Sequence, residues 1–335
     1  MIAGVVESIS EPSEELIAAV ADWNDVLVLG AGGKMGSGVS SMIARAFTAA
    51  GNPAAVLAVS RWTDVAARDE LSSGNVTTIE ADLTDSAAVS ALPEAERVIF
   101  LVGAKFGTGA APHEAWMTNT VLPAAVASRY RASRVVALST GNVYPPTAGF
   151  TGGASEDTPV APIGEYAMSC VGRERVMQHA ATNYGTQIAI VRLNYACDVR
   201  YGVLADIGHR VWSGEAVDVT VGAVNVVSQR YANEVIVRSM NHASNPPFVL
   251  NLAGPETASV RWIAAQFGRH FNKDIVIAGE EANKSLLSNA SRCHALFGYP
   301  ELSIGALIKR QAEWISSGGE LWAKPTKFER TDGKF

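Results

Sequence analysis

The sequence has few cysteines, little charge of either sign and no long apolar run, and each shortage excludes a class of protein. Its three cysteines are scattered over 335 residues with no CxxC pair, so we expect a reducing cytoplasm, no disulfide framework and no metal site. No apolar run approaches the roughly 18 to 20 residues that a membrane span needs. The net charge is -6 and there is no basic block. We therefore predict a protein with neither a membrane nor a nucleic acid as partner.

Apolar runs and helical stretches alternate through the first 200 residues. Segments with helical periodicity, such as 35–51, separate most of the apolar runs. This alternation is typical of a parallel sheet covered by helices on both faces. The sequence predicts an α/β fold, a doubly wound parallel sheet with a smaller C-terminal lobe. The expected strands are 25–30, 54–60, 76–83, 97–103, 134–140, 187–193 and 248–254.

A glycine-rich stretch, VLVLGAGGKMG, stands between the first strand and the first long helix. It places Gly30, Gly33 and Gly36 three residues apart. One glycine permits the tight turn, one lets a pyrophosphate approach the backbone, and one lets the helix pack closely on the strand. The helix N-terminus then faces the phosphates. This context predicts a dinucleotide site, and the alternative is a glycine-rich turn without a ligand.

The end of the second strand indicates which dinucleotide is bound. NAD-binding folds usually carry an acidic residue there for the ribose hydroxyls, but this chain has Ser60 followed by Arg61. A hydroxyl and a guanidinium suit a 2′-phosphate, because arginine binds phosphate through two parallel hydrogen bonds. Lys34 adds positive charge from the glycine loop. We predict NADP as cofactor, with NAD as the alternative; Arg61 as a solvated surface residue is the other interpretation.

With GAGGKMG, EADLTD (80–85) and STGNVY (139–144), the chain resembles the extended short-chain dehydrogenase/reductase family, and within it the NAD(P)-dependent epimerase/dehydratase branch. The resemblance covers roughly residues 25–320. It implies a Rossmann-type sheet, a smaller C-terminal substrate lobe and a homodimer. The domains we expect are an N-terminal helical extension (1–24), a Rossmann domain (25–196, re-entered at about 225–256), a substrate-binding lobe (197–224 and 257–320) and a surface tail (321–335).

The resemblance also assigns roles position by position. Thr140 and Tyr166 match the catalytic Ser/Thr and tyrosine, and Asn119 matches a structural asparagine. The residues implied to bind the cofactor are Gly30, Gly32, Gly33, Lys34, Met35, Gly36, Ser60, Arg61, Asp82, Leu83, Val102, Gly103, Ala104, Lys105, Asn119 and Tyr166. Those implied to contact the substrate are Asn142, Asn194, Tyr195, Arg200 and Tyr201.

The stretch EYAMSC (165–170) departs from the family pattern, because Cys170 stands where a lysine follows the catalytic tyrosine. That lysine lowers the pKa of the tyrosine, which is ordinarily near 10, by about 1 to 3 units. Without it Tyr166 is a poor base, although a neutral phenol still donates a proton. Lys105 or Arg173 would supply the charge, or another base acts. We choose Lys105 as the third catalytic residue; the alternatives are that Lys105 binds only pyrophosphate and that Cys170 is merely a small buried apolar residue.

The predicted function is hydride transfer between the nicotinamide cofactor and a carbohydrate-type substrate, namely a sugar, nucleotide-sugar or sugar acid, in an epimerase or dehydratase. Two alternatives remain open. A neutral Tyr166 suits an NADPH-dependent carbonyl reductase. The missing lysine suits a non-catalytic NAD(P)-binding sensor or regulatory protein.

Overall fold

The computed structural model describes residues 9–72, 75–105, 107, 109–322, 326–330 and 332–333, so the first eight residues of the expected N-terminal extension and part of the expected tail lie outside the described residues. The chain divides into two compact units. The first comprises Met1–Thr140, Glu165–Arg192 and Asn233–Leu250, and the second Gly141–Gly164, Leu193–Ala232 and Asn251–Phe335. The boundaries that we expect for the Rossmann domain and the substrate lobe stay predictions.

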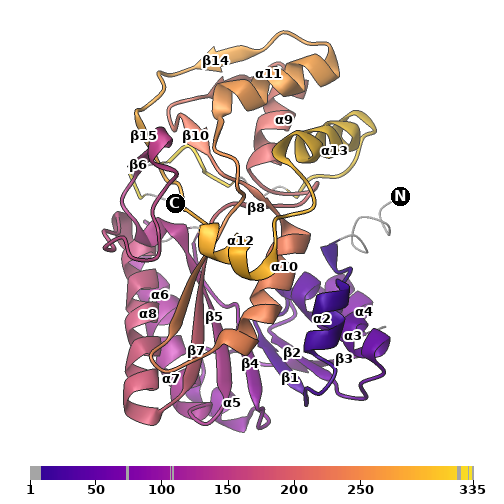
Figure 1. The fold of residues 1–335 in the computed structure, drawn as a ribbon, viewed down its shortest axis with the longest axis vertical. Helices are drawn as coiled ribbons and strands as arrows, with labels where there is room; N and C mark the ends of the chain where they lie inside the picture. The colour runs from indigo at the N-terminus through magenta and orange to yellow at the C-terminus, as the bar shows by residue number, and fades with distance from the viewer. Residues whose placement is uncertain are drawn as a thin grey trace. The chain divides into compact units, whose positions relative to one another are not determined.

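A seven-stranded sheet forms the centre of the first unit (Figure 1), with the order β12-β7-β5-β4-β1-β2-β3. Strand β1 pairs in parallel with both β2 and β4, so that Val28 lies opposite Ala58 on one side and Ile99 on the other. The winding therefore reverses direction at β1, which confirms the predicted doubly wound α/β fold. The strands are β1 (Val26–Leu29), β2 (Val56–Ser60), β3 (Val76–Glu80), β4 (Arg97–Phe100), β5 (Arg134–Thr140), β7 (Gln187–Leu193) and β12 (Phe248–Leu252).

Helices cover both faces of this sheet because the right-handed crossovers run in opposite directions from β1. Val89, Val126 and Met177 join buried strand residues in one core cluster, which places α5, α7 and α8 on the same face. The helix expected over 35–51 is confirmed as α3, and it ends where Gly51 adopts a φ of 66°. The described helices of the first unit are α2 (Glu14–Ala19), α3 (Gly36–Ala50), α4 (Val65–Ser72), α5 (Ser86–Ala91), α6 (Pro112–Trp116), α7 (Leu122–Arg129), α8 (Gly164–Tyr184) and α10 (Gln229–Arg238), with the shorter turn η4 (Ser239–His242). The boundary between the units cuts α8 before Glu165 and α10 before Asn233, so only the residues from there on belong to the first unit.

The helix between β4 and β5 is interrupted. A π-helical turn, η1 (Met117–Val121), separates α6 from α7. Such turns insert one extra residue per turn and occur frequently at functional sites. Here the turn carries Asn119, which is completely buried.

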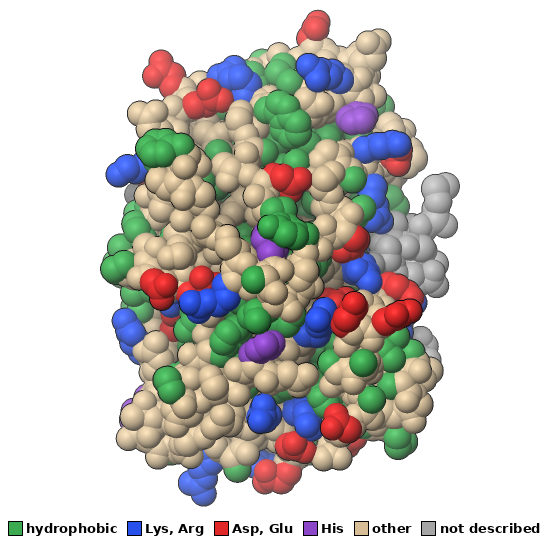
Figure 2. All heavy atoms as spheres, in the orientation of Figure 1, with side chains coloured by type: hydrophobic (Ala, Val, Ile, Leu, Met, Phe, Trp, Pro, Cys, Tyr) green, Lys and Arg blue, Asp and Glu red, His purple; other side chains and the backbone are tan. Residues whose placement is uncertain are grey.

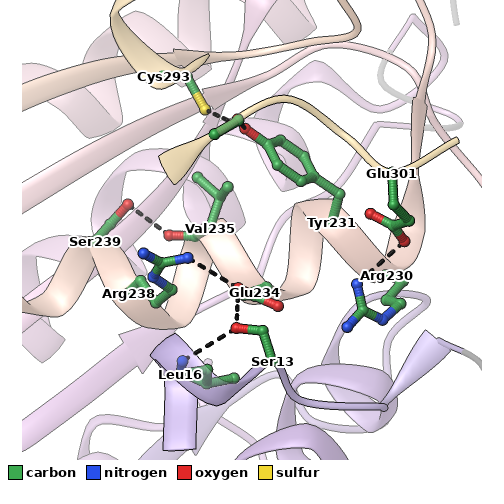
Figure 3. A network of polar contacts seen from close by, with 11 residues as sticks. Ser13, Leu16, Arg230, Tyr231, Glu234, Val235, Arg238, Ser239, Cys293 and Glu301 are labelled. Carbon is green, nitrogen blue, oxygen red and sulfur yellow. Dashed lines mark hydrogen bonds and ion pairs between the residues drawn. The ribbon is translucent and has the colours of Figure 1, made fainter. Parts of the chain in front are cut away.

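The N-terminal extension is fixed to the first unit by hydrogen bonds. The Ser13 hydroxyl accepts from the Leu16 amide at 3.1 Å and so caps the N-terminus of α2. The same hydroxyl donates to the Glu234 carboxylate on α10 at 2.6 Å, and Arg238 donates to that carboxylate at 2.9 Å (Figure 3). Because these partners are more than 200 residues apart, the extension links the two ends of the unit's sequence.

A buried ion pair joins Arg192 on β7 to Glu174 on α8. Arg192 contacts the Glu174 carboxylate through two hydrogen bonds of 2.9 and 2.6 Å, and the Ser139 hydroxyl donates to the same carboxylate at 2.6 Å. Both charged side chains are at most 6% exposed. Arg192 is therefore a residue of the core.

The second unit has its own core around α9, α11 and α13. Ile207, Phe267 and Ile308, one from each helix, are completely buried in it. Helices α11 and α13 each begin at a serine, Ser259 and Ser303, whose side chain caps the first turn. The elements are η2 (Gly141–Val143), β6 (Thr147–Ala148), η3 (Gly149–Thr151), β8 (Ala196–Cys197), α9 (Val203–Ser213), β9 (Ala216–Asp218), β10 (Ala223–Val224), β11 (Val227–Ser228), β13 (Ala258–Ser259), α11 (Val260–Phe271), β14 (Val276–Ala278), β15 (Lys284–Ser285), α12 (Ser291–Phe297) and α13 (Ile304–Ser316).

The tail departs from the expected surface position. Thr326 is 5% and Phe328 1% exposed, and Phe328 belongs to the core cluster of the second unit.

On the face drawn in Figure 2, acidic and basic side chains are interspersed and neither sign forms a large patch. None of the described helices is both long and apolar enough to cross a membrane.

The buried pair gives a stability prediction. Replacing Arg192 with leucine leaves the Glu174 carboxylate in the core without its counter-charge, so we expect the free energy of unfolding to fall by about 3 to 5 kcal/mol. Arg68→Leu is the matched control, because it removes an exposed pair with Glu80 and is expected to cost about 0 to 1 kcal/mol. Urea denaturation measures both. Equal losses in the two variants would contradict the assignment.

Candidate functional site

A pocket of about 250 Å³ opens at the carboxyl ends of β1 to β4 in the first unit. In open α/β sheets ligands bind at this edge, where the winding reverses. Nine of the predicted cofactor-binding residues line it: Gly30, Gly32, Gly33, Ser60, Arg61, Asp82, Leu83, Val102 and Gly103. Thr63, Thr84 and Thr118 also line the pocket. Thr84 lies within the EADLTD motif but was given no role, and no motif indicated Thr63 or Thr118.

The glycine loop closes the pocket on the β1 side. Gly30 has a φ of 90°, which an L side chain rarely adopts. A Cβ at Gly36 would lie 2.3 Å from the Gly30 carbonyl oxygen, so only glycine permits this approach of α3 to the loop. Met35 occupies the N-cap position of α3 and makes no side-chain cap, and Lys34 precedes it in the loop. The first turn of α3 thus has no side-chain cap, although the Gly36 amide donates to the Gly33 carbonyl at 3.1 Å.

The opposite side of the pocket is formed by the ends of β2 and β3. The Asp82 carboxylate accepts hydrogen bonds from the Thr84 amide at 3.0 Å and the Thr84 hydroxyl at 2.8 Å. These bonds lower the pKa of Asp82, and the nearby Arg61 guanidinium contributes in the same direction. At neutral pH this edge thus presents a carboxylate beside a guanidinium.

Asn119 fixes the loop that follows β4. Its side-chain oxygen accepts from the Ala104 amide at 2.9 Å, and its amide group donates to the Ala104 carbonyl at 2.8 Å. The amide group also donates to the Ser169 hydroxyl at 2.9 Å. Ala104 is thereby held at both backbone groups. Asn119 is not among the residues that line the pocket, so the cofactor contact that the resemblance implies for it stays a prediction.

Arg173 on α8 completes this network. It is 5% exposed and donates to the Asn119 side-chain oxygen at 2.7 Å, the Asn119 carbonyl at 3.3 Å and the Leu138 carbonyl at 2.7 Å. All three acceptors are neutral, so the guanidinium places a buried positive charge at the carboxyl end of β5. Sequence reasoning considered Arg173 only as a spare cation and missed its contact with Asn119.

Tyr166 and Thr140 come together at the same end of β5. Their side chains share a hydrogen bond, and Cys170 contacts the Tyr166 hydroxyl from the next turn of α8. Burial raises the pKa of Tyr166 well above its usual value, Cys170 adds to that rise, and Thr140 and Arg173 oppose it. Burial likewise raises the pKa of the Cys170 thiol. Both groups are therefore neutral at physiological pH.

Lys105 lies over the Tyr166 ring. Its ammonium nitrogen is 5.9 Å from the ring centroid, at the outer limit of a cation–π contact. It follows Ala104 directly, so the Asn119 network sets its backbone position. The same ammonium slightly opposes the rise in the pKa of Cys170.

The residues expected to contact substrate belong to the second unit, and the structure separates them. Asn142 and Tyr195 line one small pocket, together with Tyr144, Phe328 and Arg330, which sequence reasoning missed. Asn194 is 2% exposed and donates to the Asn225 side chain at 2.7 Å. Arg200 and Tyr201 are not among the pocket's lining residues. Arg200 pairs with Asp198 at 3.0 Å and lies over Trp322, and Tyr201 packs on the same ring.

The sequence comparison decides the family. The model of the NAD dependent epimerase/dehydratase family matches residues 26–197, just over half of the chain. The chain belongs to this family. No curated protein matches the sequence.

Solved structures of similar fold agree with this membership of the epimerase/dehydratase family. UDP-glucose 4-epimerase from Thermotoga maritima matches with a TM-score of 0.72 and 17% identity, over 88% of this chain and 99% of its own. DesIV, a dTDP-glucose 4,6-dehydratase from Streptomyces venezuelae, gives 0.74 and 16%, over 88% and 97%. UDP-glucuronic acid 4-epimerase from Bacillus cereus gives 0.72 and 15%, over 88% and 96%. At these identities the likeness shows the fold alone.

The glycine loop of this epimerase/dehydratase family member can be tested by one methyl group. Gly36→Ala would place a Cβ against the backbone of Gly30 and Ala31, where neither side can yield without moving the loop. We expect dinucleotide binding to weaken at least about ten-fold, the equivalent of about 1.4 kcal/mol, as measured by calorimetry. Gly305→Ala is the matched control, since a Cβ there meets nothing closer than 3.9 Å. Unchanged binding in Gly36→Ala would contradict the assignment of the loop.

Proposed function

We propose that this protein is an NAD(P)-dependent enzyme of the epimerase/dehydratase type that acts on a sugar, nucleotide-sugar or sugar acid. The observation that carries the proposal is the pair of hydroxyls, Thr140 and Tyr166, at the carboxyl end of β5, on the same sheet edge as a glycine-lined pocket. Each relative named above is an epimerase or dehydratase of a nucleotide-sugar, and the Bacillus cereus structure contains NAD.

The pocket residues fit a dinucleotide. A Cβ at Gly32 would lie 2.6 Å from the Ser60 hydroxyl, so the absence of a side chain keeps the pocket open between β1 and β2. Gly33 and the uncapped start of α3 suit the pyrophosphate, and Asp82 and Leu83 suit the adenosine side. When bound, the nicotinamide supplies the hydride acceptor and donor. The protein contributes orientation and the proton.

Tyr166 is the proton-exchanging group in this proposal. Because burial holds its phenol neutral, the Tyr166 hydroxyl donates a proton to a carbonyl oxygen readily and accepts one from a carbinol poorly. Thr140 shares a hydrogen bond with that hydroxyl and orients it. A reacting oxygen placed between the two hydroxyls is held by both.

Lys105 takes over part of the role of the lysine that Cys170 replaces. Its ammonium lies on the Tyr166 side of α8, and the loop that carries it borders the predicted cofactor. A cation near the phenol favours its ionised form. Arg173 also favours the ionised form of Tyr166, and its guanidinium donates to backbone and side-chain oxygens in the core.

Cofactor choice rests on Ser60 and Arg61. Both line the pocket, and the acidic residue typical of NAD-binding chains is absent from this strand end. We therefore favour NADP over NAD, since a guanidinium binds a 2′-phosphate through two hydrogen bonds.

One observation favours a carbonyl reductase as the second candidate. A tyrosine with a raised pKa is a better proton donor than acceptor, and reduction of a ketone needs only the donor. A reductase consumes its cofactor, whereas an epimerase regenerates it.

The homodimer implied by the family resemblance and the cytoplasmic location stay predictions.

Turnover of nucleotide-sugars tests the function. With NADP and NAD supplied side by side, we expect conversion of UDP-glucose or UDP-glucuronic acid, and Tyr166→Phe should lower kcat at least about 100-fold by removal of the proton-exchanging group. Product analysis with a count of cofactor consumed separates epimerase from reductase. A Tyr166→Phe protein that keeps full activity would contradict the mechanism. Tighter binding of NAD than of NADP would contradict the cofactor choice.

The pH dependence of carbinol oxidation tests whether a positive charge near Tyr166 lowers the pKa of its phenol. Oxidation needs the Tyr166 phenolate, so its rate rises with pH towards the raised pKa of Tyr166. Cys170→Lys adds a positive charge one turn away, and we expect the rising limb to move about 1 to 3 pH units lower. Lys105→Met should move it higher. Cys170→Met, of similar length and uncharged, is the control for crowding, and a shift equal to that of Cys170→Lys would rule out charge as the cause.

A further inference from the structure

Trp62 stands between two residues that line the pocket at the carboxyl ends of β1 to β4, Arg61 and Thr63, but is not itself part of the pocket wall. We propose that Trp62 is a positioning residue for cofactor choice, whose ring anchors the turn after β2 and thereby holds the Arg61 guanidinium where a 2′-phosphate would bind. This inference rests on the proposed function and deepens it, because it concerns the cofactor of that enzyme.

The backbone of Trp62 is strained. Its φ is 48°, in the left-handed region that bulky side chains seldom adopt and that glycine adopts freely. Residues 61–64 connect β2 to α4, and the Asp64 side chain accepts from the Ala67 amide at 3.0 Å in the first turn of that helix. The chain therefore turns within four residues. A glycine at position 62 would make the same turn without strain, so what tryptophan adds there is its side chain.

The Trp62 side chain is held by the elements around it. It is 5% exposed, and its indole N–H donates to the Ile79 carbonyl on β3 at 2.9 Å. The ring also extends towards the glycine loop, since a Cβ at Gly32 would lie 3.6 Å from its Cε3 atom. A strained backbone persists only where the surrounding structure enforces it. Burial and the bond to β3 are the contacts that enforce this one.

Arg61 is available for a ligand beside this anchor. Its guanidinium is near enough to Asp82 to contribute to the lowered pKa of that carboxyl, but the hydrogen bonds that Asp82 accepts come from Thr84. Among the described residues, none forms an ion pair or a hydrogen bond with the Arg61 side chain. Ser60 and Thr63, the residues next to this pair, also line the pocket and carry hydroxyls. A guanidinium with hydroxyl donors close by suits a phosphate.

The ratio of NADP affinity to NAD affinity tests this role, because only NADP carries the 2′-phosphate. Trp62→Gly keeps the turn and removes the anchor, so we expect calorimetry of the full chain to show a ratio about ten-fold lower, with the loss confined to NADP. Trp62→Phe keeps an aromatic ring and loses only the bond to Ile79. We expect it to lower the ratio less, by about three-fold.

A double-mutant cycle separates positioning of Arg61 from general damage. If Trp62 acts through Arg61, Trp62→Gly lowers the ratio no further once Arg61→Gln has removed the guanidinium. Trp23→Gly is the matched control, since Trp23 is a 4% exposed tryptophan of the same unit that precedes β1, at the opposite edge of the sheet. We expect that variant to keep the wild-type ratio.

Equal losses of NADP and NAD affinity in Trp62→Gly would show a merely structural role and overturn the inference. An additive drop in the double variant, an unchanged ratio in both Trp62 variants, or an equal drop in Trp23→Gly would overturn it as well. A wild-type protein that binds neither dinucleotide refutes the proposed function instead. Binding of both dinucleotides with a ratio that Trp62→Gly does not alter refutes only the role of Trp62.

Discussion

The candidate site depends on the hydrogen bonds of one buried amide, that of Asn119. Its oxygen accepts from Ala104 and Arg173, and its amide group donates to Ala104 and Ser169. All these bonds lie within 2.7 to 2.9 Å, so both ends of the side chain are satisfied, which is the condition for a polar group to be tolerated in a core. One residue thereby joins the cofactor loop to α8. The position of Lys105, the next residue after Ala104, follows from this constraint.

Two opposing effects act on Tyr166. Burial disfavours the phenolate, and the positive charge of Arg173 favours it. Burial prevails, so the hydroxyl is neutral and suited to donate. An enzyme that must also remove a proton therefore needs additional positive charge near Tyr166, and the Lys105 ammonium, 5.9 Å from the centroid of its ring, is one source. Tyr166 is thus better suited to donate a proton than to remove one.

The sequence was sufficient where a local pattern has one structural solution. Gly30 and Gly36 follow from a turn that tolerates no side chain. Apolar runs of strand length gave the sheet because parallel strands are buried on both faces. The buried residues of the C-terminal tail could not be predicted from such local patterns. Phe328 lies in a tail of mostly polar residues, and only its tertiary contacts bury it.

Long-range pairings account for the other differences. Arg192 and Glu174 are 18 residues apart, and Arg173 and Asn119 are 54 apart, so no periodicity relates them. The π-helical turn at Asn119 was hidden for another reason, since one extra residue does not break a helical pattern that continues on both sides. In each case the sequence carries the residue types and the fold decides the partner.

The same geometry explains why residue 170 can be a cysteine. Position 170 is 1% exposed and lies one turn before Arg173, which already places a positive charge at the end of β5. A lysine at 170 would bury a second cation close to the first, and like charges in a dry site raise the cost of ionising both. A small neutral thiol avoids that repulsion. Arg173 then supplies positive charge to Tyr166 from within the core, and the contribution that we propose for Lys105 would come from the loop after β4.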